Sequence, residues 1–233
     1  MTLVPGHGDF SGPFFEVLEV RLPVHRAGPR IHGLCSDILS RVYDSLSLKY
    51  EFMTPSSLEN EDVLVGEALS TPGIRSRFPL YVGRTMAVYK KQTIPHWRGI
   101  HSLDYTRAVW RKGYNYQLSP QLSSIQFGLW NEADTQEKAW FQLDMDQYDV
   151  YIDTLGDIDA FIVSHHVNKG LYGRQLLWKR TSRIGFAATP RGRELRRIYD
   201  REMEKLYRSG ELKKLHSHWG LPFDDGHWPT PGS

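Results

Sequence analysis

Apolar residues recur along the chain with two different periods, one typical of helices and one typical of strands. Between Gly33 and Tyr43 they recur at three- and four-residue steps, which predicts a helix with one buried face. The residues on this face are Leu34, Ile38, Leu39 and Val42. A helix is also predicted over Thr135–Leu143 from its composition.

Short runs rich in β-branched and aromatic residues predict strands between these helices. The strands expected are Thr2–Val4, Phe14–Leu22, Leu46–Phe52, Asp62–Val65, Tyr81–Lys90, Arg107–Trp110 and Tyr148–Asp153, and a further short apolar run covers Asp159–Val163. Ser70–Gly73 contains proline and glycine, so a turn there is expected to present Arg75 at the carboxyl end of a strand. Gly113 follows another strand, and its position suggests a strand, glycine turn and helix.

The carboxyl-terminal part is predicted to be helical. Thr189 is a capping residue followed by Pro190 at the first helical position. An apolar stripe then runs through Leu195, Ile198, Tyr199, Met203, Leu206 and Tyr207, and Ser209 begins a second short helix that ends at Gly220. Alternating strands and helices followed by a helical end indicate the α/β class.

Composition argues against some classes of function but does not decide between one domain and two lobes. The 233 residues suffice for one large domain or two lobes, and 40% hydrophobic with 24% charged residues is ordinary for a folded protein. A formal net charge of +2 gives no broad positive surface, so nucleic-acid binding is not expected. The basic run Arg191–Arg197 is interpreted as the solvated face of a helix, with contact to an acidic partner as the alternative.

Cysteine and histidine usage argues against redox chemistry and against a metal. Cys35 is the single cysteine, so an internal disulfide and a multi-cysteine site are both excluded. The pairs His165–His166 and His216–His218 have no carboxylate or thiol at a spacing typical of zinc motifs, so neither metal nor cofactor is expected. No apolar stretch is long enough to span a membrane, and Met1–Val20 lacks the features of a signal peptide.

Several segments together resemble the bacterial extracellular (periplasmic) solute-binding proteins of amino-acid ABC transporters, family 3. An Asp-led strand at Asp62 runs into Thr71-Pro-Gly-Ile-Arg75 and then Pro79-Leu-Tyr81. Further on, Leu143-Asp-Met-Asp-Gln-Tyr-Asp149-Val-Tyr-Ile-Asp153 is similar to the family's second-lobe signature. Supporting matches are Gly12-Pro13-Phe14, Gly33 to Leu39, and the closing helices that end in Trp219-Gly220.

The resemblance implies the type 2 periplasmic-binding fold, an α/β fold of two lobes joined by two crossing hinge strands. Residues 1–84 and 186–233 would form lobe 1, residues 85–185 the inserted lobe 2, and Tyr81–Lys90 and Arg183–Ala188 the hinges. It further implies a periplasmic, monomeric binding protein that carries an amino acid or related carboxylate in the cleft between its lobes. A transporter permease or a sensor domain would be its partner, and neither membrane insertion nor catalysis is expected.

The predicted site pairs a guanidinium with a carboxylate, because an amino acid carries opposite charges a few ångströms apart. Arg75 can hold a carboxylate through two parallel hydrogen bonds, and Asp153 can accept from the ammonium. Each also has a purely structural interpretation, Arg75 as a solvated surface group and Asp153 as a helix cap. The other candidate ligand-binding residues are Ser70, Thr71, Phe14, Tyr114, Asn115 and Tyr116.

Two alternatives remain open from the sequence. An enzyme on the same scaffold, similar to cyclohexadienyl dehydratases, would need a general acid or base, for which Glu67, Asp149 and Asp153 are the candidates. A signalling or structural relative with a degenerate site is the second alternative, favoured by the short stretch between Phe52 and Asp62.

Overall fold

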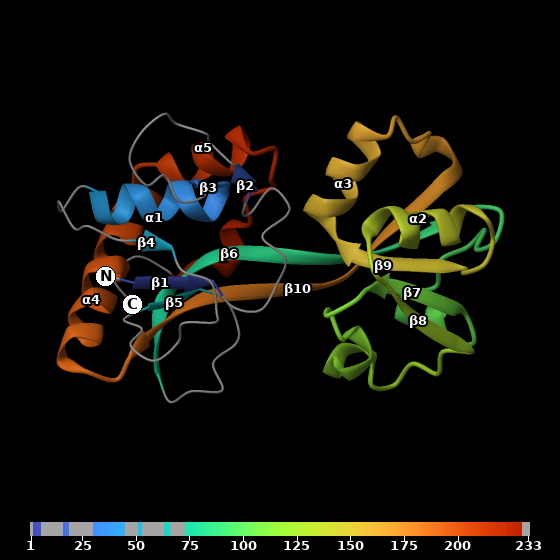
Figure 1. The fold of residues 1–233 in the computed structure, drawn as a ribbon, viewed down its shortest axis with the longest axis horizontal. Helices are drawn as coiled ribbons and strands as arrows, with labels where there is room; N and C mark the ends of the chain where they lie inside the picture. The colour runs from blue at the N-terminus through green and yellow to red at the C-terminus, as the bar shows by residue number, and fades with distance from the viewer. Residues whose placement is uncertain are drawn as a thin grey trace. The chain divides into compact units, whose positions relative to one another are not determined.

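The computed structural model describes residues 2–5, 16–18, 30–44, 51–52, 63–65 and 73–229. The chain divides into two compact units (Figure 1). Unit 1 comprises Met1–Val82 and Thr181–Ser233, and unit 2 comprises Gly83–Arg180. The predicted boundaries lay after residues 84 and 185. The predicted elements that fall at Phe14, Ser70 and Thr71 lie outside the described residues.

The described strands of unit 1 form a mixed sheet. Its elements are β1 (Thr2–Pro5), β2 (Glu16–Leu18), β3 (Arg30–His32), α1 (Leu34–Asp44), β4 (Glu51–Phe52), β5 (Val63–Val65), α4 (Pro190–Arg208), α5 (Glu211–His218) and a 3-10 turn at Asp225–His227. Strand β1 pairs in parallel with β4 and β5, and β5 pairs antiparallel with the end of β10 (Tyr172–Ala187). Strands β2 and β3 form a separate antiparallel pair.

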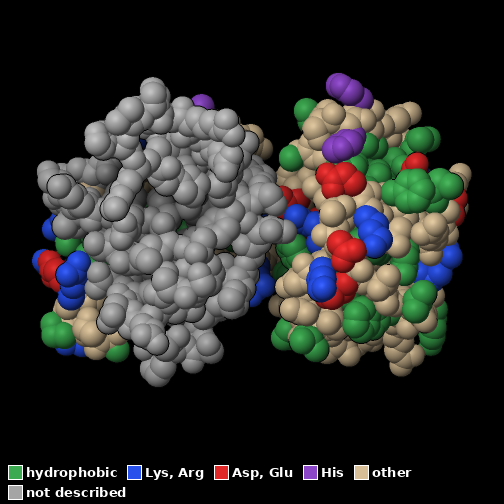
Figure 2. Space-filling view, viewed as in Figure 1, with side chains coloured by type: hydrophobic (Ala, Val, Ile, Leu, Met, Phe, Trp, Pro, Cys, Tyr) green, Lys and Arg blue, Asp and Glu red, His purple; other side chains and the backbone are tan. Residues whose placement is uncertain are grey.

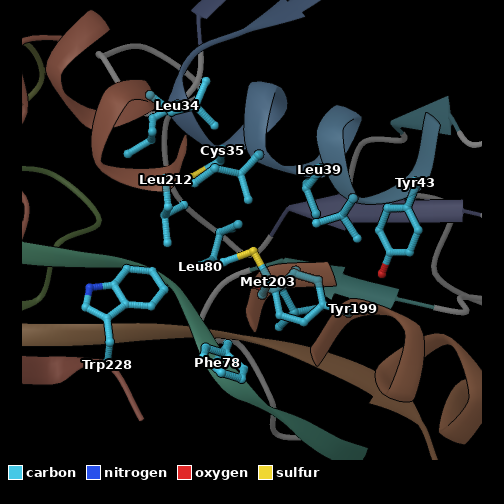
Figure 3. Packing of buried hydrophobic residues seen from close by; sticks show 14 of the residues in the cluster. Leu34, Cys35, Leu39, Tyr43, Phe78, Leu80, Tyr199, Met203, Leu212 and Trp228 are labelled. Carbon is cyan, nitrogen blue, oxygen red and sulfur yellow. The ribbon is translucent and has the colours of Figure 1, made fainter. Parts of the chain in front are cut away.

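Helix α1 buries the face that the sequence predicts. Leu34, Ile38, Leu39 and Val42 are all fully buried, so that prediction is confirmed. In Figure 3, side chains from α1 meet Phe78 and Leu80 of β6 (Gly73–Lys90), Tyr199 and Met203 of α4, and Leu212 of α5. The stripe predicted for α4 packs here as well, and this shared core joins the two chain segments of unit 1.

The start of α4 follows the predicted capping. The Thr189 hydroxyl accepts a hydrogen bond from the Gly192 amide, and Pro190 occupies the first helical turn. The second helix, α5, spans Glu211–His218 and is therefore shorter than the predicted Ser209–Gly220. In the basic run, Arg191, Arg193 and Arg197 are exposed, as expected for a solvated helix face.

Asp200 of α4 anchors the first half of β6. Its Oδ1 accepts hydrogen bonds from the amides of Arg77 at 2.7 Å and Phe78 at 3.1 Å. Asp200→Ala removes this acceptor from two partly buried amides, so the free energy of unfolding should fall by about 1 to 3 kcal/mol. Urea denaturation measures this effect. The control is Asp225→Ala, an exposed aspartate whose removal should change stability by less than about 0.5 kcal/mol.

Unit 2 is a sheet covered on both faces. Its elements are η2 (Ile100–Leu103), β7 (Arg107–Arg111), η3 (Tyr116–Leu118), η4 (Pro120–Leu122), β8 (Leu129–Ala133), α2 (Gln136–Asp144), β9 (Val150–Thr154), α3 (Leu155–Ser164) and η5 (Lys169–Leu171). Strand β7 lies between β8 and β9, parallel to both, and β9 pairs antiparallel with β6. Helices α2 and α3 pack on one face (Figure 1). An aromatic cluster centred on Trp110 covers the other face.

Two strands connect the units, as the type 2 fold requires. Strand β6 passes from unit 1 to unit 2 within the predicted Tyr81–Lys90 connection. The second connection was predicted at Arg183–Ala188, but β10 crosses the boundary between Arg180 and Thr181. Residues 184–186 instead pair with β5, which fixes them in the sheet of unit 1.

Three local predictions are wrong, and one strand was not predicted. Residues 159–163 lie in α3, because Thr154 caps a helix that begins before them. Gly73, the last residue of the predicted turn, already belongs to β6, so Arg75 lies near the start of a strand and not at a carboxyl end. No α-helix follows Gly113, since Gly113 and Asn115 both have positive φ and only a 3-10 turn follows. Strand β8 was missed because four of its five side chains are exposed or half-exposed and polar residues break the pattern.

Candidate functional site

A group of charged side chains gathers where β7 and β9 end in unit 2. The two strands are parallel, and Trp110 of β7 is in register with Ile152 of β9. The next residue of each strand, Arg111 and Asp153, therefore lies at the same edge of the sheet. In open α/β sheets ligands bind outside the carboxyl ends of the strands, so this edge is a candidate ligand-binding site.

Arg111 and Asp153 form a buried, two-point ion pair. The guanidinium Nε donates to Asp153 Oδ2 at 2.8 Å, and Nη2 donates to Oδ1 at 2.9 Å. Asp153 also accepts from the Thr154 amide at 2.7 Å and from the Tyr151 hydroxyl. Asp153 is fully buried and Arg111 is 6% exposed, so the pair is largely shielded from water.

A second carboxylate, Asp157, joins this pair from the first turn of α3. Arg111 Nη2 donates to Asp157 Oδ2 at 2.5 Å, and the Thr154 hydroxyl donates to the same oxygen at 2.7 Å. The Asp157 amide in turn donates to the Thr154 hydroxyl, which caps the helix. The Tyr114 hydroxyl contacts both Arg111 and Asp157, and its ring lies 4.6 Å from the guanidinium carbon. We call Arg111, Tyr114, Asp153 and Asp157 the strand-end cluster.

Two polar atoms of the strand-end cluster have no hydrogen-bond partner in the described part of the chain. The hydrogen bonds to the Asp157 carboxylate from Arg111, Tyr114 and Thr154 all go to Oδ2, which leaves Oδ1 open. Likewise Arg111 uses Nε and Nη2, which leaves Nη1 open. Neither of these two atoms is fully buried, so both reach solvent at the edge of the cluster.

The cluster contains one cation and two carboxylates, so it carries an excess negative charge. Burial, followed by the charge of Asp157, raises the pKa of Asp153 to about 6, although Arg111 opposes the shift. Burial lowers the pKa of Arg111, but the two carboxylates outweigh burial and the net shift is upward. Arg111 is therefore always charged.

This raised pKa makes a prediction about stability. The folded state binds the Asp153 proton more tightly than the unfolded state, so this group stabilises the fold progressively as pH falls from about 7 to about 4. Compared with Asp153→Asn, the wild type should therefore lose stability as pH rises through this window. Urea midpoints of both proteins across the window measure the difference. A difference that does not change with pH would contradict the raised pKa.

The structure places the predicted site residues in different surroundings. Arg75 is exposed on β6 of unit 1, and Phe14, Ser70 and Thr71 lie outside the described residues. Asp153 is in the strand-end cluster, but both of its oxygens are engaged inside unit 2. Tyr114 is half-buried and also belongs to the cluster.

Tyr116 and Asn115 do not belong to the cluster. Tyr116 is buried in the aromatic core, edge-to-face with Trp110 and Trp178, so it packs rather than forming an open wall. Asn115 is exposed in the left-handed region, and its amide donates to the Gly113 carbonyl. Of these three neighbouring residues, Tyr114 is the one in the strand-end cluster.

Sequence reasoning missed Arg111 and Asp157. Asp157 follows Thr154 by three residues, the spacing of a helix-capping pair, and this pattern could have located it. Arg111 directly follows the predicted strand Arg107–Trp110, but an arginine at a strand end is usually solvated. Its burial depends on the two carboxylates around it, which the sequence does not place in space.

Metal-binding clusters and membrane-spanning helices are absent from the described residues. Among them, no three His, Cys, Asp or Glu side chains are placed to hold a metal. None of the helices in the described ranges combines the length and apolar character needed to cross a bilayer. On the face shown in Figure 2, positive and negative side chains of unit 2 are interspersed, without a broad basic patch.

Comparison with known proteins gives a clear result for structure alone. No protein-family model matches the sequence, and no curated protein matches it. The binding component of an ABC transporter from Wolinella succinogenes, complexed with lysine, is 14% identical with a TM-score of 0.70, covering 95% of this chain and 96% of that chain. An ABC uptake transporter substrate-binding protein from Streptococcus pneumoniae with bound histidine is 11% identical with a TM-score of 0.67, covering 98% and 94%.

A third similar structure is the GluR0 ligand-binding core from Nostoc punctiforme in complex with L-glutamate. It is 13% identical with a TM-score of 0.64, covering 95% of this chain and 99% of that chain. At such identities the likeness establishes the fold, and the chain has the two-lobe α/β fold of periplasmic binding proteins. The structures it resembles include substrate-binding proteins of amino-acid ABC transporters, so the resemblance found in the sequence is confirmed at the level of structure.

Proposed function

We propose that this protein binds an amino acid or a related carboxylate without changing it, as the solute-binding component of a transporter or sensor. The observation that carries the proposal is the strand-end cluster, a nearly buried set of charges at the carboxyl ends of β7 and β9. Structures of the same fold hold lysine, histidine and glutamate, all small zwitterions. In this proposal Arg75 of unit 1 contributes a donor for the ligand's carboxylate.

The setting follows from the same proposal. The protein acts as a monomer outside the cytoplasmic membrane, in the periplasm, and presents its ligand to a permease or a sensor domain. The ligand's binding energy favours one arrangement of the protein over others, and the partner recognises that arrangement. Neither metal nor cofactor takes part.

Native mass spectrometry of freshly purified protein, followed by a thermal-shift screen of the L-amino acids, tests the function. A ligand present at about 100 times its Kd should stabilise the protein by about 2.7 kcal/mol, which is a readily measured rise in Tm. Arg75→Ala should weaken binding by about 2 to 5 kcal/mol. The control is Arg191→Ala, also an exposed arginine of unit 1, which should bind as the wild type does. No thermal shift with any of the amino acids would reject the proposal.

Catalysis is not part of the proposal, because Asp149 and Asp153, the two candidate acids among the described residues, are poorly placed for it. Asp149 accepts two hydrogen bonds from the Arg107 guanidinium. Burial raises the pKa of Asp149, but the hydrogen bonds from Arg107 lower it by more, so the net shift is downward. Asp153 is fully buried and cannot reach a substrate. Incubation with prephenate should therefore give no turnover, and formation of phenylpyruvate would overturn this part of the proposal.

One observation favours the alternative of a degenerate, non-binding site. Asp153 and Arg111 satisfy each other inside unit 2, as expected of groups that hold a fold together. The ligand screen distinguishes a solute-binding protein from a relative with a degenerate site. A degenerate site gives no co-purified metabolite and no thermal shift with any amino acid.

A further inference from the structure

We infer that Asp157 and Arg111 hold the two charged ends of the ligand, so that unit 2 supplies one contact to each charge of a zwitterion. This inference rests on the proposed function and assigns the ammonium contact to Asp157 instead of Asp153. It is carried by the two open atoms of the strand-end cluster, Asp157 Oδ1 and Arg111 Nη1.

Asp153 is a poor partner for an ammonium group. Its Oδ1 accepts from Arg111 and from the Thr154 amide, and its Oδ2 accepts from Arg111 and Tyr151. It has no exposed surface. A ligand would have to displace existing donors to reach it, and Asp153 therefore acts by fixing the position of the guanidinium.

Asp157 has the opposite arrangement. One oxygen receives the donors from Arg111, Thr154 and Tyr114, while the other receives none. The residue is only 8% exposed, so a hydrogen bond to Oδ1 forms in a partly desolvated place where an ionic contact is strong. The excess negative charge of the cluster is the charge that a bound ammonium would neutralise.

Arg111 provides the complementary donor. Two of its nitrogens are engaged by carboxylates, and the Tyr114 ring lies against the guanidinium, so its plane is held before any ligand arrives. The open Nη1 belongs to the same planar group that contacts Asp157. Nη1 and Oδ1 are thus a donor and an acceptor on two side chains in direct contact, and an α-amino acid offers a carboxylate to the one and an ammonium to the other.

The first test combines changes in the protein with changes in the ligand. Calorimetric titration of the full chain is carried out with the amino acid that gives the largest thermal shift and with its N-acetyl derivative, which has no ammonium. Wild type should bind the free amino acid about 30-fold or more tightly than the derivative. Asp157→Asn should lose most of this preference, since it removes the charge that the ammonium contacts.

The matched control is Asp159→Asn, a half-exposed aspartate two residues further along α3 that pairs with Arg174. It should keep the wild-type preference. Equal preference in wild type and Asp157→Asn would overturn the inference while leaving the proposed function intact. If wild type binds no amino acid at all, the proposed function itself fails, and the two failures are thus distinct.

The second test addresses Arg111 and remains informative if Asp157→Asn does not fold. Arg111→Lys keeps the positive charge between the two carboxylates but loses the second donor group. The wild type should prefer the amino acid over its α-carboxamide by about 10-fold or more, and Arg111→Lys should reduce that preference. Wild type that binds the N-acetyl derivative and the carboxamide as tightly as the free amino acid would refute the inference without any variant.

Discussion

Arg111→Met is expected to lower the free energy of unfolding of unit 2 by about 3 to 5 kcal/mol. The substitution leaves Asp153 and Asp157 facing each other, with 0% and 8% exposure and no cation between them. The cost comes from two buried charges without compensation, more than from the loss of attraction itself. Urea denaturation measures its size, and hydrogen exchange should locate the loss in β7, β9 and α3.

The same strand provides a control for this prediction. Arg107 begins β7 and also makes a two-point contact with an aspartate, Asp149, but its side chain is 44% exposed. Arg107→Met should therefore cost only about 1 kcal/mol or less, as solvent-exposed ion pairs do. The triple change Arg111→Met, Asp153→Asn and Asp157→Asn should recover most of the lost stability. Similar losses for the two arginine variants would show that burial does not set the cost.

The sequence was informative where the hydrophobic period was regular. The buried face of α1 and the stripe of α4 were predicted correctly because one amphipathic face packs against one core. Strand β9 was found by its apolar run, although both of its faces are covered. The order of such elements indicated the α/β class, and the two-lobe fold followed from the family resemblance.

Elements whose position depends on the rest of the fold were missed or misplaced. Strand β8 is an edge strand with Leu129 and Trp130 largely exposed, so its apolar residues do not mark a buried face. Strand β10 continues through a run of polar residues because neighbouring strands supply its hydrogen bonds. Local composition carries little information about either.

The sequence predicts Arg75 and Asp153 as the two groups that contact a ligand, whereas the structure shows Arg111 bonded to Asp153. A guanidinium and a carboxylate were expected, and unit 2 contains such a pair, with Arg111 as the cation. The reason for the difference is that the role of a charged residue depends on which other charges the fold brings near it. Asp153 was selected for its place at a strand end, yet only the spatial arrangement shows that Arg111 already occupies both of its oxygens.

Trp140→Ala is expected to destabilise unit 2 by about 3 to 5 kcal/mol. Trp140 is 5% exposed on α2, stacks on Phe161 with ring centroids 4.9 Å apart, and meets the Tyr151 ring edge-to-face at 6.0 Å. Removing the indole leaves a cavity between α2, α3 and β9 that these rigid neighbours cannot close. Urea denaturation followed by circular dichroism measures the loss.

Trp130→Ala is the matched control, because Trp130 also stacks on another aromatic ring but is 44% exposed on the edge strand. Its removal should cost about 1 to 2 kcal/mol. Trp140→Ala should in addition reach the strand-end cluster, since Tyr151 donates its hydroxyl to Asp153 and loses its packing partner. Ligand affinity should therefore fall in Trp140→Ala and not in Trp130→Ala, even at temperatures where both are folded. Equal effects of the two changes on affinity would show that the helix-covered core of unit 2 does not position the cluster.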